Sequence, residues 1–143
     1  MPVRTFEFFP DPKHSPDRDL TYRTEGGEIA KLMRLMGKHL MPWQRHVIDI
    51  ATEYRLDTWG RRVYKYSKIL ITVPRQSGKT TLMAPVKLHR IMTRPDAVCF
   101  STAQTGKDAG KRMMDVIKLV NTSPLAPIFK TRESNGSQGV SIR

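Results

Sequence analysis

The chain has 143 residues, enough for one domain with a hydrophobic core. Hydrophobic residues make up 38% and charged residues 27%, a balance typical of a globular protein and not of a disordered one. No apolar run approaches the roughly 20 residues that span a bilayer. The N-terminal residues also lack the apolar core of a signal peptide. We therefore expect a cytoplasmic protein without membrane contact.

The net charge of +12 is concentrated in the second half of the chain. Residues 1–72 carry 13 basic and 9 acidic residues, whereas residues 73–143 carry 12 and 4. Such an excess favours polyanionic partners, either nucleic acid or an acidic membrane surface, and we expect nucleic acid; the alternative is a solvated basic face. The single cysteine, Cys99, excludes an internal disulfide, and its apolar neighbours predict a buried strand residue.

The first half of the chain predicts an arm followed by two helices. Residues 1–25 contain several prolines among charges and predict an extended N-terminal arm. Apolar residues recur at helical spacing through residues 26–39, which predicts an amphipathic helix. A second helix is predicted to start near Pro42, because proline suits the first helical position. A short strand is expected around residues 63–66.

The second half alternates between apolar runs and helical patterns. Residues 68–73 and 97–102 predict buried strands, and they are followed by predicted helices at 80–92 and 105–121. The order strand, helix, strand, helix predicts a parallel sheet with right-handed crossovers. Asn135-Gly136 then predicts a hairpin turn, with a short strand near its end.

The junction between the first apolar run and its helix matches a phosphate-binding P-loop. Gly78 allows close approach of the backbone to an anion, and the helix N-terminus adds a favourable field. Lys79 is placed to reach the β- and γ-phosphates, and the Thr80 hydroxyl to hold Mg²⁺. Val73 stands where the full pattern has its leading glycine. The alternative is a strand-to-helix turn with an incidental lysine.

Three segments together resemble the large subunit of the terminases of tailed bacteriophages, the motor that packages viral DNA. Residues 41–45 are similar to its adenine-recognition motif, in which a glutamine, here Gln44, reads the adenine edge. Residues 73–80 are similar to its P-loop, which commonly lacks the leading glycine and carries a basic residue. Residues 101–105, with Gln104, resemble a segment linked with DNA contact or coupling.

The resemblance implies an α/β fold, the partial P-loop NTPase (RecA/ASCE-like) three-layer fold with a parallel sheet core, preceded by a helical region. It covers residues 28–143, within a predicted domain at residues 26–143 that is the N-terminal part of the ATPase domain, while the Walker B strand and the nuclease domain are absent. We expect a split gene, a truncation or a fragment. The implied cofactors are ATP and Mg²⁺. The implied partners are double-stranded DNA and, in the complete family protein, the portal protein and the terminase small subunit.

The resemblance and the loop chemistry together assign roles to individual residues. Lys79 is the catalytic residue, because it neutralises charge in the phosphoryl-transfer transition state. Arg75 can clamp phosphate oxygens, either on its own nucleotide or on a neighbouring element. The predicted nucleotide-binding residues are Gln44, Pro74, Arg75, Gln76, Ser77, Gly78, Lys79, Thr80 and Thr81. The predicted DNA-contact or coupling residues are Gln104, Lys107, Lys111 and Arg112.

The sequence lacks the carboxylates that ATP hydrolysis by this family requires. The only acidic residues after position 102 are Asp108, Asp115 and Glu133, and none follows an apolar strand. We therefore expect the nucleotide-binding part of a packaging ATPase, with negligible turnover by this chain alone. The alternatives are a helicase-like P-loop ATPase and a non-catalytic, basic nucleic-acid-binding protein.

Overall fold

The structure is a computed structural model that describes residues 12–143. The part of the predicted N-terminal arm that precedes residue 12 lies outside these described residues. Along the chain the elements are β1 (Arg23–Thr24), α1 (Gly26–Leu35), α2 (Pro42–Ala51), β2 (Glu53–Leu56), β3 (Arg62–Tyr64), α3 (Lys79–Thr93), α4 (Gly106–Asn121), the 3-10 helix η1 (Ala126–Ile128), β4 (Phe129–Arg132) and β5 (Gly139–Ile142).

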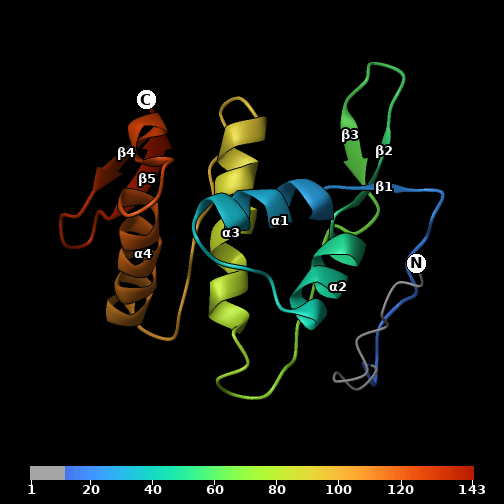
Figure 1. The fold of residues 1–143 in the computed structure, drawn as a ribbon, viewed down its shortest axis with the longest axis horizontal. Coiled ribbons are helices and arrows are strands. Elements are labelled where there is room, and N and C mark those ends of the chain that lie inside the picture. The colour runs from blue at the N-terminus through green and yellow to red at the C-terminus, as the bar shows by residue number, and fades with distance from the viewer. Residues whose placement is uncertain (1–11) are drawn as a thin grey trace.

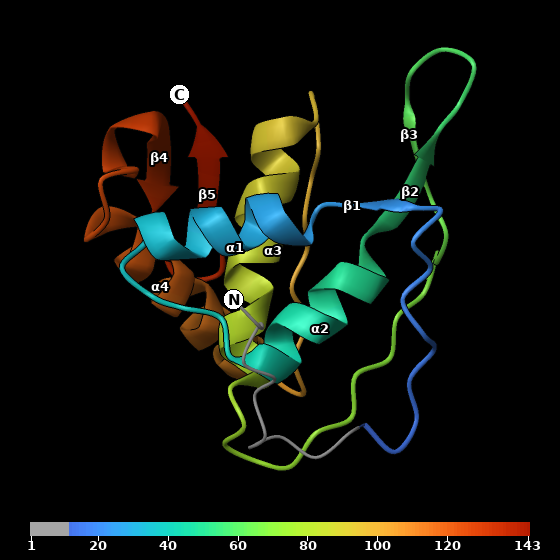
Figure 2. The same ribbon diagram turned by 45° about the vertical axis from the view of Figure 1, so that its right-hand side comes forward.

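Helix α3 runs through the middle of the molecule (Figure 1). Helix α1 crosses it and also packs on α2, while α4 and the β4–β5 hairpin lie on the opposite side of α3 (Figure 1, Figure 2). The β1–β2–β3 sheet lies at the end of the molecule farthest from α4. Different elements therefore contact α3 along its length. The first residues of α3 directly follow the candidate phosphate loop.

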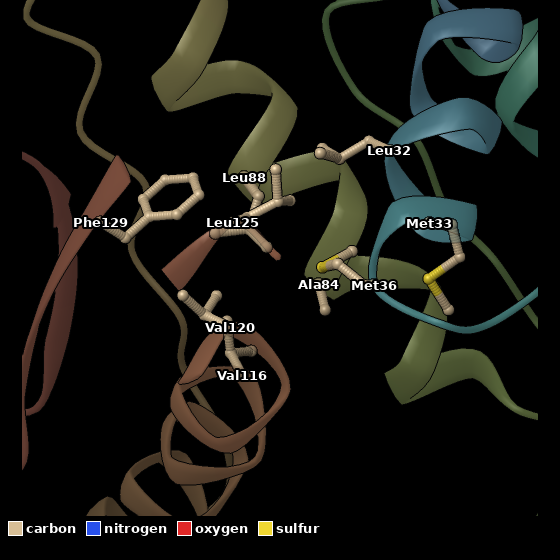
Figure 3. Close-up of a cluster of buried hydrophobic side chains, with 9 residues drawn as sticks. All are labelled: Leu32, Met33, Met36, Ala84, Leu88, Val116, Val120, Leu125 and Phe129. Carbon is tan, nitrogen blue, oxygen red and sulfur yellow. The ribbon is translucent and has the colours of Figure 1, made fainter. Parts of the chain in front are cut away.

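Two clusters of buried side chains hold these elements together. The larger cluster joins α1, α3, α4 and β4 around Leu88 and Phe129 (Figure 3). The smaller cluster joins one residue from each of the first three helices, Ile29, Ile48 and Leu82. Because α3 contributes to both clusters, it is the element against which the other helices are positioned.

The helices predicted from apolar periodicity are confirmed with small shifts at their ends. The predicted helix 80–92 corresponds to α3, and the predicted helix 105–121 corresponds to α4. The second helix begins at Pro42 as expected. Helix α1 ends at Leu35 and not at residue 39, because Gly37 takes a φ of +74° just beyond its end. The hairpin turn at Asn135-Gly136 is also confirmed, since it joins β4 to β5.

The predicted parallel sheet is wrong. Within residues 12–143 there are two sheets, one with the order β1-β2-β3 and one with the order β4-β5, and every strand pair in them is antiparallel. The chain therefore does not have the RecA-like P-loop fold that its sequence suggested. It is a small mixed α/β structure in which the helices, and not a central sheet, form the core.

The sheet was mispredicted because the two apolar runs are extended but join no ladder. In the described part of the chain neither residues 68–73 nor residues 97–102 belong to a strand. Ile71 packs on the smaller cluster, whereas Leu70 beside it is 92% exposed. Phe100 is likewise 87% exposed. Apolar composition alone therefore does not make a strand, because a strand also needs a neighbour with which to exchange hydrogen bonds.

A buried carboxylate joins the β2–β3 hairpin to α3. Glu25 precedes α1 and is 1% exposed. Its Oε1 accepts hydrogen bonds from Arg62 Nη1 at 2.7 Å and from the Tyr64 hydroxyl. Its Oε2 lies 3.6 Å from Arg90 Nη1 and 3.7 Å from His89 Nδ1, both on α3. Burial alone would raise the pKa of Glu25, but the bonds from Tyr64 and Arg62 and the charge of Arg90 hold that pKa below its usual range.

A second buried carboxylate ties the segment before β1 to the same sheet. Glu53 Oε1 accepts from Arg18 Nη1 at 2.5 Å and from the Asp19 backbone N–H at 2.7 Å. Its Oε2 lies 3.0 Å from Lys65 Nζ. Desolvation would raise the pKa of Glu53, but these donors, Lys65 foremost, lower it. The end of the predicted arm is therefore attached to the sheet by charge-assisted bonds.

We predict that Phe129→Ala lowers the unfolding free energy by about 3–5 kcal/mol, because it empties part of the larger cluster. Phe100→Ala is the matched control and should change the free energy by less than about 0.5 kcal/mol, because that ring is exposed. Urea unfolding followed by circular dichroism measures both. A large loss for Phe100→Ala would mean that residues 97–102 are buried after all.

We also predict that stability falls in acid. The pKa values of Glu25 and Glu53 are lower in the folded chain, so their contribution is fully present above the unfolded carboxyl pKa of about 4.3 and is lost as the pH falls through the folded values. Urea midpoints between about pH 7 and pH 3 measure this.

In the same series Glu25→Gln should cost most near neutral pH and progressively less in acid, where the wild-type carboxyl is itself protonated. Glu133→Gln, at an exposed position, is the control. A cost of Glu25→Gln that stays constant with pH would contradict an ionised Glu25.

Candidate phosphate-binding site

An open hollow of about 450 Å³ lies where the extended segment turns into α3. The residues that line it are Val73, Pro74, Arg75, Gln76, Ser77, Gly78, Lys79 and Thr80. The sequence predicted that this segment forms one loop, and the structure brings its residues together around one concave surface. Both ends of the loop are fixed, since Ile71 packs on the smaller cluster and Leu82 is buried within it.

Gly78 is the residue that allows the loop to enter the helix. It is the N-cap of α3 and has φ +85° and ψ 17°, a left-handed conformation that glycine adopts without strain. The 15-residue helix that follows presents its first backbone N–H groups without intrahelical partners. Because the helix dipole also favours negative charge there, this helix start can bind an anion.

Gln44 of α2 holds this helix start in place. Its side chain is buried, at 2% exposure. Its Nε2 donates to the Gly78 carbonyl oxygen at 2.9 Å, and its Oε1 accepts from the Met41 backbone N–H at 2.8 Å. The structure thus brings together two predicted site residues that are 34 positions apart. The amide is engaged with protein groups, and the role predicted for it in reading adenine stays a prediction.

The loop folds back on itself before the glycine. Ser77 Oγ donates to the Pro74 carbonyl oxygen at 2.8 Å. Gln76 has φ +63°, an uncommon value for a residue with a Cβ. A left-handed non-glycine residue costs of order 1–3 kcal/mol and persists only where the surroundings enforce it, and such residues cluster at ligand sites.

The charge of the loop is positive. Arg75 and Lys79 are exposed, and no ion pair within residues 12–143 involves either of them. Among the residues that the structure describes, no carboxylate lines the hollow. Two cations beside an open helix N-terminus can bind a phosphate group. The arrangement supplies no group that could act as a general base on an attacking water.

Thr80 offers the hydroxyl that was predicted to hold Mg²⁺. It is exposed at the second position of α3, and Thr81 behind it is half-buried. No group of three or more His, Cys, Asp or Glu residues in the described part of the chain could hold a metal ion. Mg²⁺ is usually coordinated by few protein ligands together with waters and substrate phosphates. The single hydroxyl of Thr80 is therefore compatible with a Mg²⁺ ion that binds together with a nucleotide.

The four predicted DNA-contact residues lie on and before α4. Gln104 precedes this helix, and Lys107, Lys111 and Arg112 occupy its first two turns, all of them exposed. No hydrogen bond between described residues links them to the loop. Thr105 caps the helix by accepting from the Asp108 backbone N–H at 3.1 Å. Lys107, Lys111 and Arg112 therefore place three positive charges in the first turns of α4, and they are not among the residues that line the hollow.

Two features near the site were not foreseen from the sequence. Lys87 on α3 is hydrogen-bonded to Ser101, which holds the extended segment 97–102 against the helix. Burial, reinforced by the charge of Arg112, lowers the pKa of Lys87. The bond from Gln44 to Gly78 was also missed. A glutamine at the third position of a helix signals a capping role, but nothing local identifies its distant partner.

Comparisons with known proteins add no family to this geometry. Neither a protein-family model, nor a curated protein, nor a solved structure matches the chain. The helices of the described residues are all too short or too polar to cross a membrane. The case for a function therefore depends on the loop, on its charge and on the sequence resemblance.

We predict that Gly78→Ala destabilises the chain more than Gly136→Ala does. Both glycines have positive φ, so each alanine costs roughly 1–2 kcal/mol of backbone strain. At Gly78 the new Cβ would also lie 2.9 Å from Gln44 Nε2, whereas no atom lies within 4 Å of a Cβ at Gly136. Displacing the Gln44 amide should cost about 1 kcal/mol more.

Unfolding free energies in urea test this difference. In a Gln44→Ala background the cost of Gly78→Ala should fall to that of Gly136→Ala, because the displaced group is gone. Equal costs in the wild-type background would contradict the contact between Gln44 and the loop.

Proposed function

We propose that residues 73–80 bind the phosphates of a nucleotide, and that the chain is the ATP-binding part of a terminase-type DNA-packaging motor. The observation that carries the nucleotide site is the start of α3. There a left-handed glycine, an exposed lysine and an exposed arginine surround one hollow. The resemblance of three sequence segments to terminase large subunits supports the more specific part of the proposal.

In this proposal the loop residues bind and orient the nucleotide. Backbone N–H groups at the start of α3 and the Lys79 ammonium bind the β- and γ-phosphates. Arg75 adds a second, planar cation. Thr80 contributes one ligand to the Mg²⁺ that accompanies ATP, a metal that neutralises phosphate charge when bound. Gln44 fixes the Gly78 carbonyl and so keeps the helix N-terminus open toward the ligand.

The same geometry predicts binding without appreciable hydrolysis. Positioning the attacking water requires a polar or acidic group near the γ-phosphate. The residues that line the hollow include none with a carboxylate. We therefore propose that this chain binds ATP and that turnover needs groups beyond those lining the hollow. The motor would act in the host cytoplasm on double-stranded DNA, together with a portal protein and a terminase small subunit.

A non-catalytic, basic nucleic-acid-binding protein is the second candidate, favoured by the net charge of +12. A helicase-like ATPase would share the nucleotide site of the main proposal. Only the non-catalytic candidate predicts that ATP has no effect on stability, so nucleotide binding separates it from the other two.

We predict that Mg²⁺-ATP raises the thermal midpoint of the wild-type chain. A ligand at one hundred times its Kd adds about 2.7 kcal/mol of stability. Lys79→Ala should abolish most of this shift, because it removes a phosphate-binding cation. Lys31→Ala, an exposed lysine on α1, is the matched control and should leave the shift unchanged.

Two further ligands sharpen the measurement. Inorganic triphosphate should reproduce part of the shift in thermal midpoint if the loop binds phosphates. The shifts caused by GTP and by ATP, compared at equal concentration, show whether the chain distinguishes the two bases. Absence of any shift with ATP, or an equal shift in Lys79→Ala, would reject the nucleotide site and favour the non-catalytic candidate.

A further inference from the structure

The β2–β3 hairpin extends away from the helices, and its loop is the most protruding part of that end of the molecule (Figure 1, Figure 2). The two faces of the hairpin have different surroundings. Tyr54 and Tyr64 form a cross-strand pair on the inner face, with ring centroids 6.2 Å apart. Arg55 and Val63 form the next pair on the opposite face, where both are exposed and the Arg55 guanidinium lies 4.0 Å from the centre of the Tyr22 ring.

The turn at the tip of the hairpin is ordered by hydrogen bonds to Asp57. Asp57 Oδ1 accepts from the backbone N–H groups of Trp59 at 2.9 Å and Arg61 at 2.8 Å. The Gly60 N–H donates to the Asp57 carbonyl oxygen at 3.0 Å. Desolvation would raise the pKa of Asp57, but the bonds from Arg61 and Trp59 lower it, so the carboxylate that orders this turn stays ionised near neutral pH.

This ordered turn presents a large aromatic ring to solvent. Trp59 is 77% exposed, far more than a tryptophan with no external partner usually is. The Arg61 guanidinium lies 4.8 Å from the centre of the ring, and Arg61 Nε is 2.7 Å from Asp57 Oδ2. The ring is therefore held at the tip by a cation on one face, and the remaining aromatic surface has no protein partner among the described residues.

The charges of the hairpin indicate a polyanionic partner. Besides Arg61 on the ring, Arg55 of β2 is exposed, donates to Thr21 Oγ1 at 3.3 Å, and has no acidic partner in the described part of the chain. The chain as a whole carries +12. An aromatic platform with cations beside it is how proteins bind single-stranded nucleic acid, because bases stack on the ring while phosphates contact the cations.

We propose that the tip of the β2–β3 hairpin binds nucleic acid at unpaired bases, with Trp59 as the stacking platform and Arg55 and Arg61 as phosphate contacts. An intact duplex offers no free base face to such a ring, so the ligand is a single strand or an unpaired end. The proposal rests on the nucleic-acid partner of the proposed function, but it is independent of the nucleotide loop and of the basic residues of α4.

Intrinsic fluorescence tests this assignment directly. The chain has two tryptophans, and Trp43 is half-buried against the smaller cluster. In a Trp43→Phe background Trp59 is the sole reporter. A single-stranded oligonucleotide should quench its emission in a saturable way, whereas a blunt, closed duplex of the same sequence should quench it far less. Equal quenching by the two ligands would overturn the stacking role.

Affinity for a labelled single strand, followed by anisotropy, gives the matched test in the wild-type background. Trp59→Ala should weaken binding about tenfold, which corresponds to about 1.4 kcal/mol. Trp59→Tyr should restore most of the affinity because it keeps an aromatic face. Phe100→Ala removes an equally exposed ring elsewhere and should have no effect. Unchanged affinity in Trp59→Ala would overturn the proposal.

Two more variants separate this inference from the proposed function. Arg55→Ala should reduce the salt dependence of single-strand binding, because a phosphate contact is lost. Lys79→Ala should abolish the ATP shift while leaving the Trp59 response intact. If ATP binds but Trp59→Ala has no effect on the strand, the hairpin assignment alone fails. If Trp59 responds but ATP does not bind, the nucleotide site alone fails.

Discussion

The arrangement of the chain depends on one buried charge, the carboxylate of Glu25. It is 1% exposed and is shared by Arg62 and Tyr64 of the hairpin and by Arg90 of α3. A buried ion is tolerated only when such partners replace water, and removing one partner typically costs about 3–5 kcal/mol. The position of the β1–β2–β3 sheet relative to the helices is therefore set by an electrostatic network, because within residues 12–143 neither apolar cluster includes a residue of β1, β2 or β3.

Helix α3 connects this network to the candidate site. His89 and Arg90, in its last turns, face Glu25, while Gly78 caps its first turn and is bonded to Gln44. Between them, Leu82 and Leu88 fix the helix in the two clusters. Because α3 is held at both ends, it keeps the phosphate loop and the projecting hairpin in a fixed relative position, although the two surfaces carry different kinds of side chain.

The sequence predicted those parts of the structure that depend on local spacing. Helical periodicity located α3 and α4, and Asn135-Gly136 located the β4–β5 turn, because these signals act over a few residues. The buried strands predicted at residues 68–73 and 97–102 were wrong, since strand pairing depends on distant segments. The loop at Gly78 could be predicted because its sequence signal is local. Its hydrogen bond to Gln44 and the partners of Glu25 could not be predicted, because these contacts join residues that are far apart in the sequence.

The missing sheet changes the physical basis of the candidate site. In a strand-supported loop, the backbone ladder holds the residues that face the phosphates. Here no ladder supports the segment before Pro74, and the contacts that shape the loop are the Gln44 bond to Gly78, the Ser77 bond to Pro74 and the burial of Leu82. Each hydrogen bond contributes only about 1 kcal/mol. Phosphate affinity should therefore be unusually sensitive to the buried amide of Gln44, a residue that need not touch the ligand to govern its binding.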